Sequence, residues 1–474
     1  MNTPPLFSVV CVVKDEASTI ENCIESILNQ DYPSIEIIVQ DGDSTDGTLE
    51  ILLQYGERVK VESKADSGPS EAFLRAIRRI RGKYWCACLA DETLAPGALA
   101  KAAEALESSP QTGALIGKVA FTNSQGETIG VSSTEEFSLE RYFLSDVTPP
   151  FAAAFFRSSL FEDFDYPREA LDSGEFIVWL HVGLHAEVES LDEIASTFMY
   201  REDAGSNNPK LLKRFMESRE AAIRFLARTW PEHPALAGKE NLALAGNYID
   251  RMMYFLRIDD FEQSESLLER ALGCGAEPIQ FRKIASICVE EAVWRLNQGS
   301  LDSAYQYTRF GKKTPFKTRY FPRLHRLVNT LKKPAATNLA ILEQEDETLS
   351  YSWKDWRPEI ESSQRKPEIE FLRNLGFEKV VLFEKGFVEE SLRKACEHLG
   401  FEVSREINES HQSDRSVAVS LSEREKEWLE SSTWQELLNK GVPAISWQDI
   451  AFLDMLPISP YIQSKSHTRD SSSK

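Results

Sequence analysis

The amino-terminal part of the chain alternates between short apolar runs and amphipathic segments. The apolar runs cover residues 7–13, 35–39, 59–62 and 85–89, and helical patterns lie between them. Alternating strands and helices predict parallel strands joined by right-handed helical crossovers. The polar loops then follow the carboxyl ends of the strands, where open α/β sheets bind their ligands. We therefore expect an α/β fold with a mostly parallel central sheet and functional groups at this one edge.

The most informative loop follows the run at 85–89. Two adjacent acids, Asp91 and Glu92, end this run, and Pro96 and Gly97 then precede an Ala-rich helical pattern. Adjacent carboxylates supply the hard oxygen ligands that Mg²⁺ and Mn²⁺ prefer, and such a cation can hold a diphosphate. Taken alone, an acidic pair is more often a solvated turn, so the other loops decide between the two interpretations.

Composition excludes several classes of protein. The chain has 474 residues, too many for one core, and about three domains are expected. Its net charge of −21 argues against a nucleic-acid or anionic-membrane surface. The 7 cysteines have no metal-site spacing, which predicts reduced core thiols. Neither a signal-peptide pattern nor an apolar run long enough to span a bilayer is found, so we expect a cytoplasmic protein without a transmembrane segment.

Three motifs follow one another at characteristic spacing. They are DGDSTDGT at 41–48, DSG at 66–68 and LADETLAPGAL at 89–99. Together with the first strand and helix, they resemble family 2 glycosyltransferases of the GT-A fold over roughly the first 200 residues. The resemblance implies inverting transfer of a sugar from a nucleotide-diphosphate sugar to a glycan, lipid-linked or protein acceptor. It also implies Mn²⁺ or Mg²⁺ as cofactor.

The resemblance assigns nucleotide-sugar-binding roles to several side chains. Asp41 would contact the base or ribose, and Asp66 would help to close that pocket. Val13 and Arg201 match further positions of the same site, Arg201 within an Arg-x-His-x-Gly-Ser pattern that lies beside the diphosphate in relatives.

The resemblance also assigns a metal site to the acidic pair. Asp91 would contact the ribose or the metal, and Glu92 would be the metal ligand that bridges to the diphosphate. A leaving diphosphate develops negative charge, which a divalent cation stabilises as a Lewis acid.

A general base is implied farther along the chain. Relatives carry an acid four residues before a tryptophan, and counting back from Trp179 gives Glu175, with Asp172 as the less favoured alternative. Such a base takes the proton of the acceptor hydroxyl while that oxygen attacks the anomeric carbon. The structural alternative for Glu175 is a helix N-terminal acid favoured by the macrodipole. We expect His181 to be a packing residue.

Four residues differ from the usual family pattern. Gly42 replaces a second acid, Leu74 an asparagine, Glu92 an aspartate and Asp203 a histidine. These differences keep open a second hypothesis, a GT-A-like binding or scaffold protein without catalytic activity. A nucleotidyltransferase would need a Gly/Arg/Lys-rich phosphate loop after the first strand, and VVKDEAS is not one.

The remaining chain predicts further domains after a GT-A domain at 1–205. Residues 206–335 have helical patterns, and aligning Phe261 with Leu301 suggests TPR-like hairpins that could bind a partner or mediate self-association. The basic stretch 312–326 is either a solvated face or a docking site for an anionic acceptor.

The carboxyl-terminal third shows no family resemblance. Residues 336–365 read as a linker, 366–463 as a small α/β domain, and 464–474 as a disordered tail. The strands expected in this small domain, which we predict to form a mostly parallel sheet, are 378–384, 401–405, 416–421 and 443–446.

Overall fold

The structure is a computed structural model. It describes residues 4–133, 136–199, 201, 209–316, 320–332, 370–375, 377–383, 393–394, 396–397, 401–404, 416–420 and 444–446. The chain divides into two compact units, Met1–Arg251 with Ala271–Ala276 and Met252–Arg270 with Glu277–Lys474. The expected linker and tail, and Asp203, lie outside the described residues. The predicted domain boundaries stay predictions.

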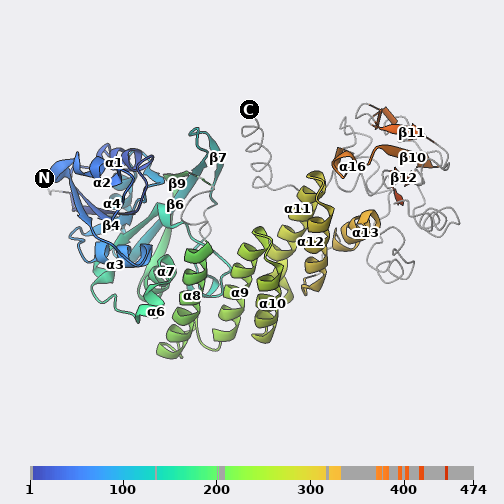
Figure 1. Ribbon diagram of the computed structural model, residues 1–474. Coiled ribbons are helices and arrows are strands. Elements are labelled where there is room, and N and C mark those ends of the chain that lie inside the picture. Colours follow the sequence, from blue (N-terminus) through green and yellow to red (C-terminus); the bar gives the residue numbers. More distant parts are fainter. Residues whose placement is uncertain are drawn as a thin grey trace. The chain divides into compact units, whose positions relative to one another are not determined.

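The first unit is built on a parallel half-sheet that confirms the alternation seen in the sequence (Figure 1). Its strands are β1 (Phe7–Val13), β2 (Ile35–Asp41), β3 (Val59–Ser63) and β4 (Tyr84–Ala87). They pair in parallel in the order β3-β2-β1-β4. The helices between them are α1 (Ile20–Leu28), α2 (Thr48–Leu53) and α3 (Pro69–Ile77), with η1 (Gly56–Arg58) before β3.

The other half of the sheet is mixed. Its strands are β5 (Glu92–Leu94), β6 (Thr112–Thr122), β7 (Thr128–Val131), β8 (Ala154–Arg157) and β9 (Glu187–Met199). Strand β8 is antiparallel to β4 and β6, β5 is antiparallel to β9, and β6 runs parallel to β9. The segment between β4 and β5 is too short for a parallel crossover, so β5 pairs with β9 instead.

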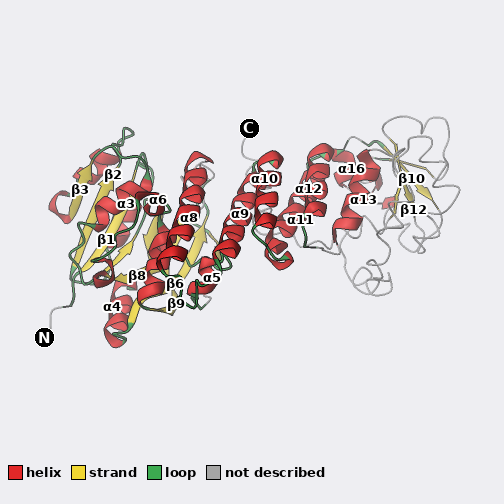
Figure 2. Ribbon diagram, turned by 90° about the horizontal axis from the view of Figure 1, so that it is seen from below, coloured by secondary structure: helices red, strands yellow, loops and turns green. Residues whose placement is uncertain are grey.

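Helices cover both faces of this sheet (Figure 2). On one face, β1 packs against α1 and α4 (Ala98–Ser108) in one hydrophobic cluster. On the other face the Trp85 ring stacks on Phe156, with ring centroids 4.6 Å apart, and Trp179 of α7 (Glu175–His185) lies 5.2 Å from Phe156. Further helical elements of residues 139–257 are α5 (Leu139–Phe143), η2 (Phe151–Ala153), η3 (Ser158–Phe161), α6 (Arg168–Leu171), α8 (Pro209–Thr229) and α9 (Glu240–Arg257).

Two predictions about core residues are confirmed. The cysteines are free thiols, all of them buried except the half-buried Cys274. His181 is buried, and its two ring nitrogens lie 2.7 Å from the Tyr166 hydroxyl and 2.6 Å from the Leu160 carbonyl. Both ring nitrogens of His181 therefore have a hydrogen-bond partner inside the protein, as expected for a packing residue.

Helical hairpins follow in the chain. Helices α10 (Phe261–Gly273) and α12 (Leu301–Lys313) begin at the two residues that the sequence comparison aligned, and the short η5 (Pro278–Phe281) precedes α11 (Arg282–Asn297). Three residues separate α11 from α12, which makes them an antiparallel pair. Helix α13 (Tyr320–Lys332) packs against α12. Among the described residues, no helix is both long and apolar enough to cross a membrane.

The second unit also contains a small parallel sheet. Its strands are β10 (Lys379–Phe383), β11 (Glu402–Ser404), β12 (Ser416–Ser420) and β13 (Ala444–Ser446), in the order β11-β10-β12-β13. All three pairings are parallel, which confirms the four strands expected from the sequence. Helix α16 (Glu370–Asn374) precedes this sheet.

We predict that acid destabilises the second unit through His325. Burial, and next the charge of Lys312, lower the pKa of His325 to about 4, and its Nδ1 lies 3.0 Å from the Thr308 hydroxyl. The folded state therefore holds the neutral ring, and its stabilising contribution is present above the ordinary pKa near 6.5 and is lost as the pH falls towards 4. Chemical denaturation between pH 7 and 4 should show a steeper loss of stability for the wild type than for His325→Gln. Parallel curves would contradict this prediction.

Candidate functional site

The loops after β1 and β2 are joined by side-chain hydrogen bonds at the carboxyl edge of the sheet. Asp15 accepts a hydrogen bond of 2.7 Å from the Thr45 N–H, and Asp46 accepts one of 2.9 Å from the Ala17 N–H. A hydrogen bond from the Thr48 hydroxyl, followed by the one from Ala17, lowers the pKa of Asp46. The DGDSTDGT motif therefore holds two neighbouring loops together.

Asp41 shapes the loop that follows it. Its side chain is fully buried, and its Oδ2 accepts hydrogen bonds of 3.1 Å from the N–H groups of Asp43 and Ser44. The Ser63 hydroxyl at the end of β3 donates to the same oxygen at 2.5 Å. Asp41 thus ties the β2 loop to β3, and both of its oxygens are used within the protein.

Three loops meet at Gly42. Its N–H donates to the Val13 carbonyl at 2.8 Å, and the Lys14 ammonium donates to its carbonyl at the same distance. A Cβ at this position would lie 2.9 Å from the Asp66 carboxylate and 3.3 Å from the Lys14 Cβ. The glycine at this position leaves room for the Asp66 carboxylate to lie this close. Asp66 also accepts a hydrogen bond of 2.8 Å from the Gly68 N–H.

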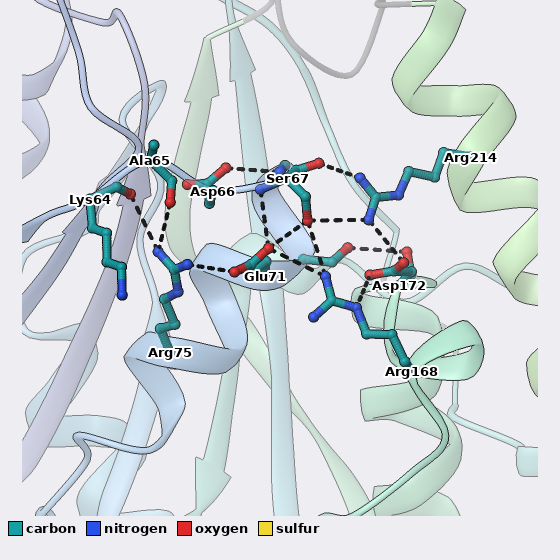
Figure 3. Close-up of polar contacts among 11 residues, drawn as sticks. Lys64, Ala65, Asp66, Ser67, Glu71, Arg75, Arg168, Asp172 and Arg214 are labelled. Atoms are coloured by element: carbon teal, nitrogen blue, oxygen red, sulfur yellow. Dashed lines mark hydrogen bonds and ion pairs between the residues drawn. The ribbon is translucent and has the colours of Figure 1, made fainter.

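A polar network fixes the DSG loop from outside (Figure 3). Arg214 of α8 donates to the Ser67 carbonyl and, at 2.9 Å, to Asp172. Arg168 of α6 donates to the Ser67 hydroxyl at 3.0 Å and pairs with Asp172 at 3.2 Å. Hydrogen bonds from Ser67 are the main reason that the pKa of Glu71 falls to about 2. Asp172 is therefore held by two arginines, which disfavours it as a free base.

Glu92 lies deeper than its partner in the acidic pair. It begins β5 with only 5% of its surface exposed, and its Oε2 accepts a hydrogen bond of 2.8 Å from the Leu89 N–H. Burial, with the charges of Asp91 and Glu175, raises its pKa to about 8. Asp91 lies in the turn before β5 and is half-buried, so it presents the more accessible carboxylate of the two.

Glu16 is a site residue that the sequence analysis did not identify. Arg201, which follows β9, donates to both carboxylate oxygens of Glu16 at 2.8 and 2.7 Å. Burial and then the charge of Glu16 raise the pKa of Asp91, while Arg201 opposes this effect. The position of Glu16 shortly after the first strand was the only sequence signal for its role. Its partner Arg201 is 185 residues away, so no local pattern could reveal the pair.

Glu175 differs from Asp172 in having no hydrogen-bond partner in the part of the chain that the structure describes. It begins α7 after Gly174, whose φ of 62° suits glycine. Its side chain is exposed, yet nearby protein atoms partly desolvate it, and this raises its pKa against the opposing charge of Arg219. Since its charge also acts on Glu92, the predicted base and the acidic pair share one electrostatic site.

The acidic pair fits a hard divalent cation. Burial raises the pKa of both carboxyl groups, and the charge of Asp91 further raises the pKa of Glu92, a repulsion that a bound cation would relieve. Within the described ranges, no cluster of three or more His, Cys, Asp or Glu side chains is arranged to hold a metal. Mg²⁺ is commonly held by one or two carboxylates together with substrate phosphates, which matches this donor set.

Comparison with known proteins identifies the amino-terminal region. Residues 8–164 match the model of glycosyl transferase family 2. A putative teichuronic acid biosynthesis glycosyltransferase, TuaG of Bacillus subtilis, is 38% identical over 87 residues, which is 18% of this chain and 34% of TuaG. Hyaluronan synthase of Pasteurella multocida is 32% identical over 102 residues, which is 21% of this chain and 10% of the synthase. The matches thus span about a third or less of these relatives.

Solved structures give weaker matches over more of the chain. S. aureus TarS 1–349 in complex with UDP-GlcNAc has a TM-score of 0.43 at 17% identity, covering 72% of this chain and 91% of that one. The mannosyltransferase PcManGT of Pyrobaculum calidifontis, in complex with GDP-Man and Mn²⁺, has a TM-score of 0.38 at 17% identity, covering 58% and 77%. Residues 8–164 therefore match glycosyl transferase family 2, and the mixed α/β sheet of the first unit agrees with the GT-A fold expected from the sequence.

Proposed function

We propose that this chain is an inverting glycosyltransferase that moves a sugar from a nucleotide-diphosphate sugar to an acceptor hydroxyl. The observation that carries the proposal is the shared electrostatic site of Asp91, Glu92 and Glu175 inside a family 2 domain. A site that gathers carboxyl groups with raised pKa values is a candidate for metal binding and proton transfer.

The loops at the carboxyl edge would bind the nucleotide. Asp41 would order the β2 loop, and Asp66 in the DSG loop would lie beside it, with the Val13 end of β1 as the floor. Arg201 would contribute positive charge near the diphosphate while it remains paired with Glu16. We assign Asp41, Asp66, Val13 and Arg201 to the nucleotide-sugar site because they belong to loops and strand ends at this edge of the sheet.

Asp91 and Glu92 would hold Mn²⁺ or Mg²⁺, Asp91 from the more accessible position. When bound, the cation would neutralise negative charge on the departing diphosphate. Because burial raises the pKa of Glu92 to about 8, this carboxyl group must lose its proton before it can hold the cation, so metal affinity should rise with pH.

Glu175 would act as the general base. Its carboxylate takes the proton of the acceptor hydroxyl, the acceptor oxygen forms a bond to the anomeric carbon, and the bond from that carbon to the diphosphate breaks on the opposite side. A raised pKa makes this carboxylate a stronger base, although less of it is ionised at low pH. The result is one new glycosidic bond with inverted configuration and a free nucleoside diphosphate.

We also propose a class of acceptor and a cellular location. TuaG and hyaluronan synthase carry names of polysaccharide synthesis, which favours a glycan acceptor over a lipid-linked or protein one. We place the enzyme in the cytoplasm, where nucleotide sugars are made, and give the helical hairpins a role in binding a partner or a second copy.

Calorimetric titration with UDP, GDP and dTDP, each with and without Mn²⁺, tests the proposal. Micromolar binding of one nucleotide that chelation abolishes would support it and would select the sugars to assay for turnover. If none binds to folded protein, the donor-site assignment fails.

We predict that Arg214→Ala weakens donor binding more than it slows turnover. The change removes the bonds of Arg214 to Ser67 and Asp172, so the DSG loop becomes less ordered before the donor binds. The KM for the donor should rise several-fold with a smaller change in kcat. Arg228→Ala removes an exposed arginine of the same helix and serves as control. An unchanged KM would show that the network does not order the loop.

A further inference from the structure

A cavity of about 690 Å³ lies at the opposite edge of the sheet from the proposed donor site. Gly82 and Lys83, which precede β4, line it together with Arg157 and Ser158 at the end of β8. Because β8 is antiparallel to β4, these residues mark the amino end of β4. The proposed donor site lies beyond the carboxyl end of the same strand, so the two sites are separate.

Two buried polar groups of the cavity wall have no hydrogen-bond partner within the described part of the chain. One is the indole N–H of Trp85, whose side chain is fully buried, and the other is the hydroxyl of Ser158. Buried donors are nearly always satisfied in proteins, by protein, water or ligand. Neither atom is exposed at the cavity surface, so a ligand would reach these donors only if side chains of the wall move.

Two arginines add unpaired positive charge. The guanidinium groups of Arg78 and Arg81 line the cavity, are exposed, and have no ion-pair or hydrogen-bond partner among the described residues. The other two cations of the wall are already engaged, since Lys83 pairs with Glu107 and Arg157 donates to backbone carbonyls.

Acids and apolar groups complete the lining. Glu162 and Asp165 are exposed at the cavity and would repel a highly charged anion. Phe161, Phe164 and Ile77 offer apolar surface, and the Phe161 ring lies 5.0 Å from that of Trp85. The cavity thus combines a donor-rich part with an apolar wall, and its volume is within the range of small-ligand sites.

We propose that this cavity binds an amphipathic organic anion, with a phosphate or carboxylate group facing Arg78 and Arg81 and an apolar body against the aromatic wall. Guanidinium groups recognise both oxyanions through paired N–H donors. The two acids, Glu162 and Asp165, would limit the charge that the site accepts. Such a ligand would bind independently of the metal and of the nucleotide.

The test uses n-octyl phosphate, n-octanoate, n-octanol and inorganic phosphate as probes in calorimetric titrations of the full chain. We expect one of the two octyl anions to bind at least tenfold more tightly than octanol and inorganic phosphate, and which one binds identifies the head group. Binding should persist with chelator present and with the Asp91→Ala variant, because this site is not the donor site.

Variants separate the cavity from general surface binding. Arg78→Ala/Arg81→Ala should weaken octyl-anion binding at least tenfold, whereas Arg228→Ala, which removes one exposed arginine of α8 away from the cavity, should not. Equal binding by the double variant and the wild type, or anions that bind no better than octanol, would overturn the proposal.

Discussion

Glu175→Gln is expected to lower kcat by about 10²–10⁴-fold while nucleotide affinity changes little. A positioned general base contributes a factor of this size, and glutamine keeps the shape of the side chain but cannot accept the proton. Glu175 is exposed, has a raised pKa and has no hydrogen-bond partner in the described ranges, so the change breaks no visible contact. Steady-state assays with the donor that calorimetry selects would measure the effect.

Glu169→Gln is the matched control for this variant. Glu169 is an exposed acid on α6, six positions before Glu175, and its amide should leave kcat unchanged. If Glu175→Gln retains full turnover, Glu175 is not the base. Nucleotide binding without turnover in the wild type would instead favour the GT-A-like binding protein that the sequence left open.

Asp91→Ala is expected to weaken Mn²⁺-dependent nucleotide binding at least about 100-fold. Altering groups that merely orient metal ligands already costs about 10–100-fold in affinity, and Asp91 is proposed as a ligand itself. The variant also removes a charge that raises the pKa of Glu92, so Glu92 should ionise at lower pH. Titration of UDP, GDP or dTDP at fixed Mn²⁺ concentration measures the loss.

The control for Asp91 is Asp31→Ala, which removes an exposed acid before β2. Its nucleotide binding should match that of the wild type. Wild-type affinity in Asp91→Ala would move the metal site to Glu92 alone or exclude metal from donor binding. Metal-independent binding in the wild type would contradict the proposed cofactor.

Local patterns were sufficient to predict the parallel strands of the amino-terminal half-sheet and of the carboxyl-terminal sheet. Strand β1 (residues 7–13) and the four carboxyl-terminal strands coincide with apolar or β-branched runs. The bounds of such strands depend on the conformational preferences of neighbouring residues, which the sequence shows directly. The second half of the amino-terminal sheet was less predictable, because the placement of β8 between β4 and β6 depends on contacts distant in sequence.

The candidate site shows the same limit. Motif spacing identified Asp91 and Glu92, but their different burial follows from β5 pairing with β9, which no local pattern encodes. Likewise Asp172 and Glu175 were both possible bases from the sequence. Their difference depends on Arg168 and Arg214, and the latter is contributed by another helix.

Arg168 and Arg214, which each contact both Ser67 and Asp172, have a thermodynamic consequence. Asp172 lies three residues before Glu175, so the arginines that order the DSG loop also hold the segment that carries the proposed base. Occupancy of the proposed nucleotide pocket and the placement of Glu175 would then share one coupling free energy. Linkage makes such coupling reciprocal: a donor analogue that tightens acceptor binding by some factor must itself bind more tightly by that same factor when the acceptor is present.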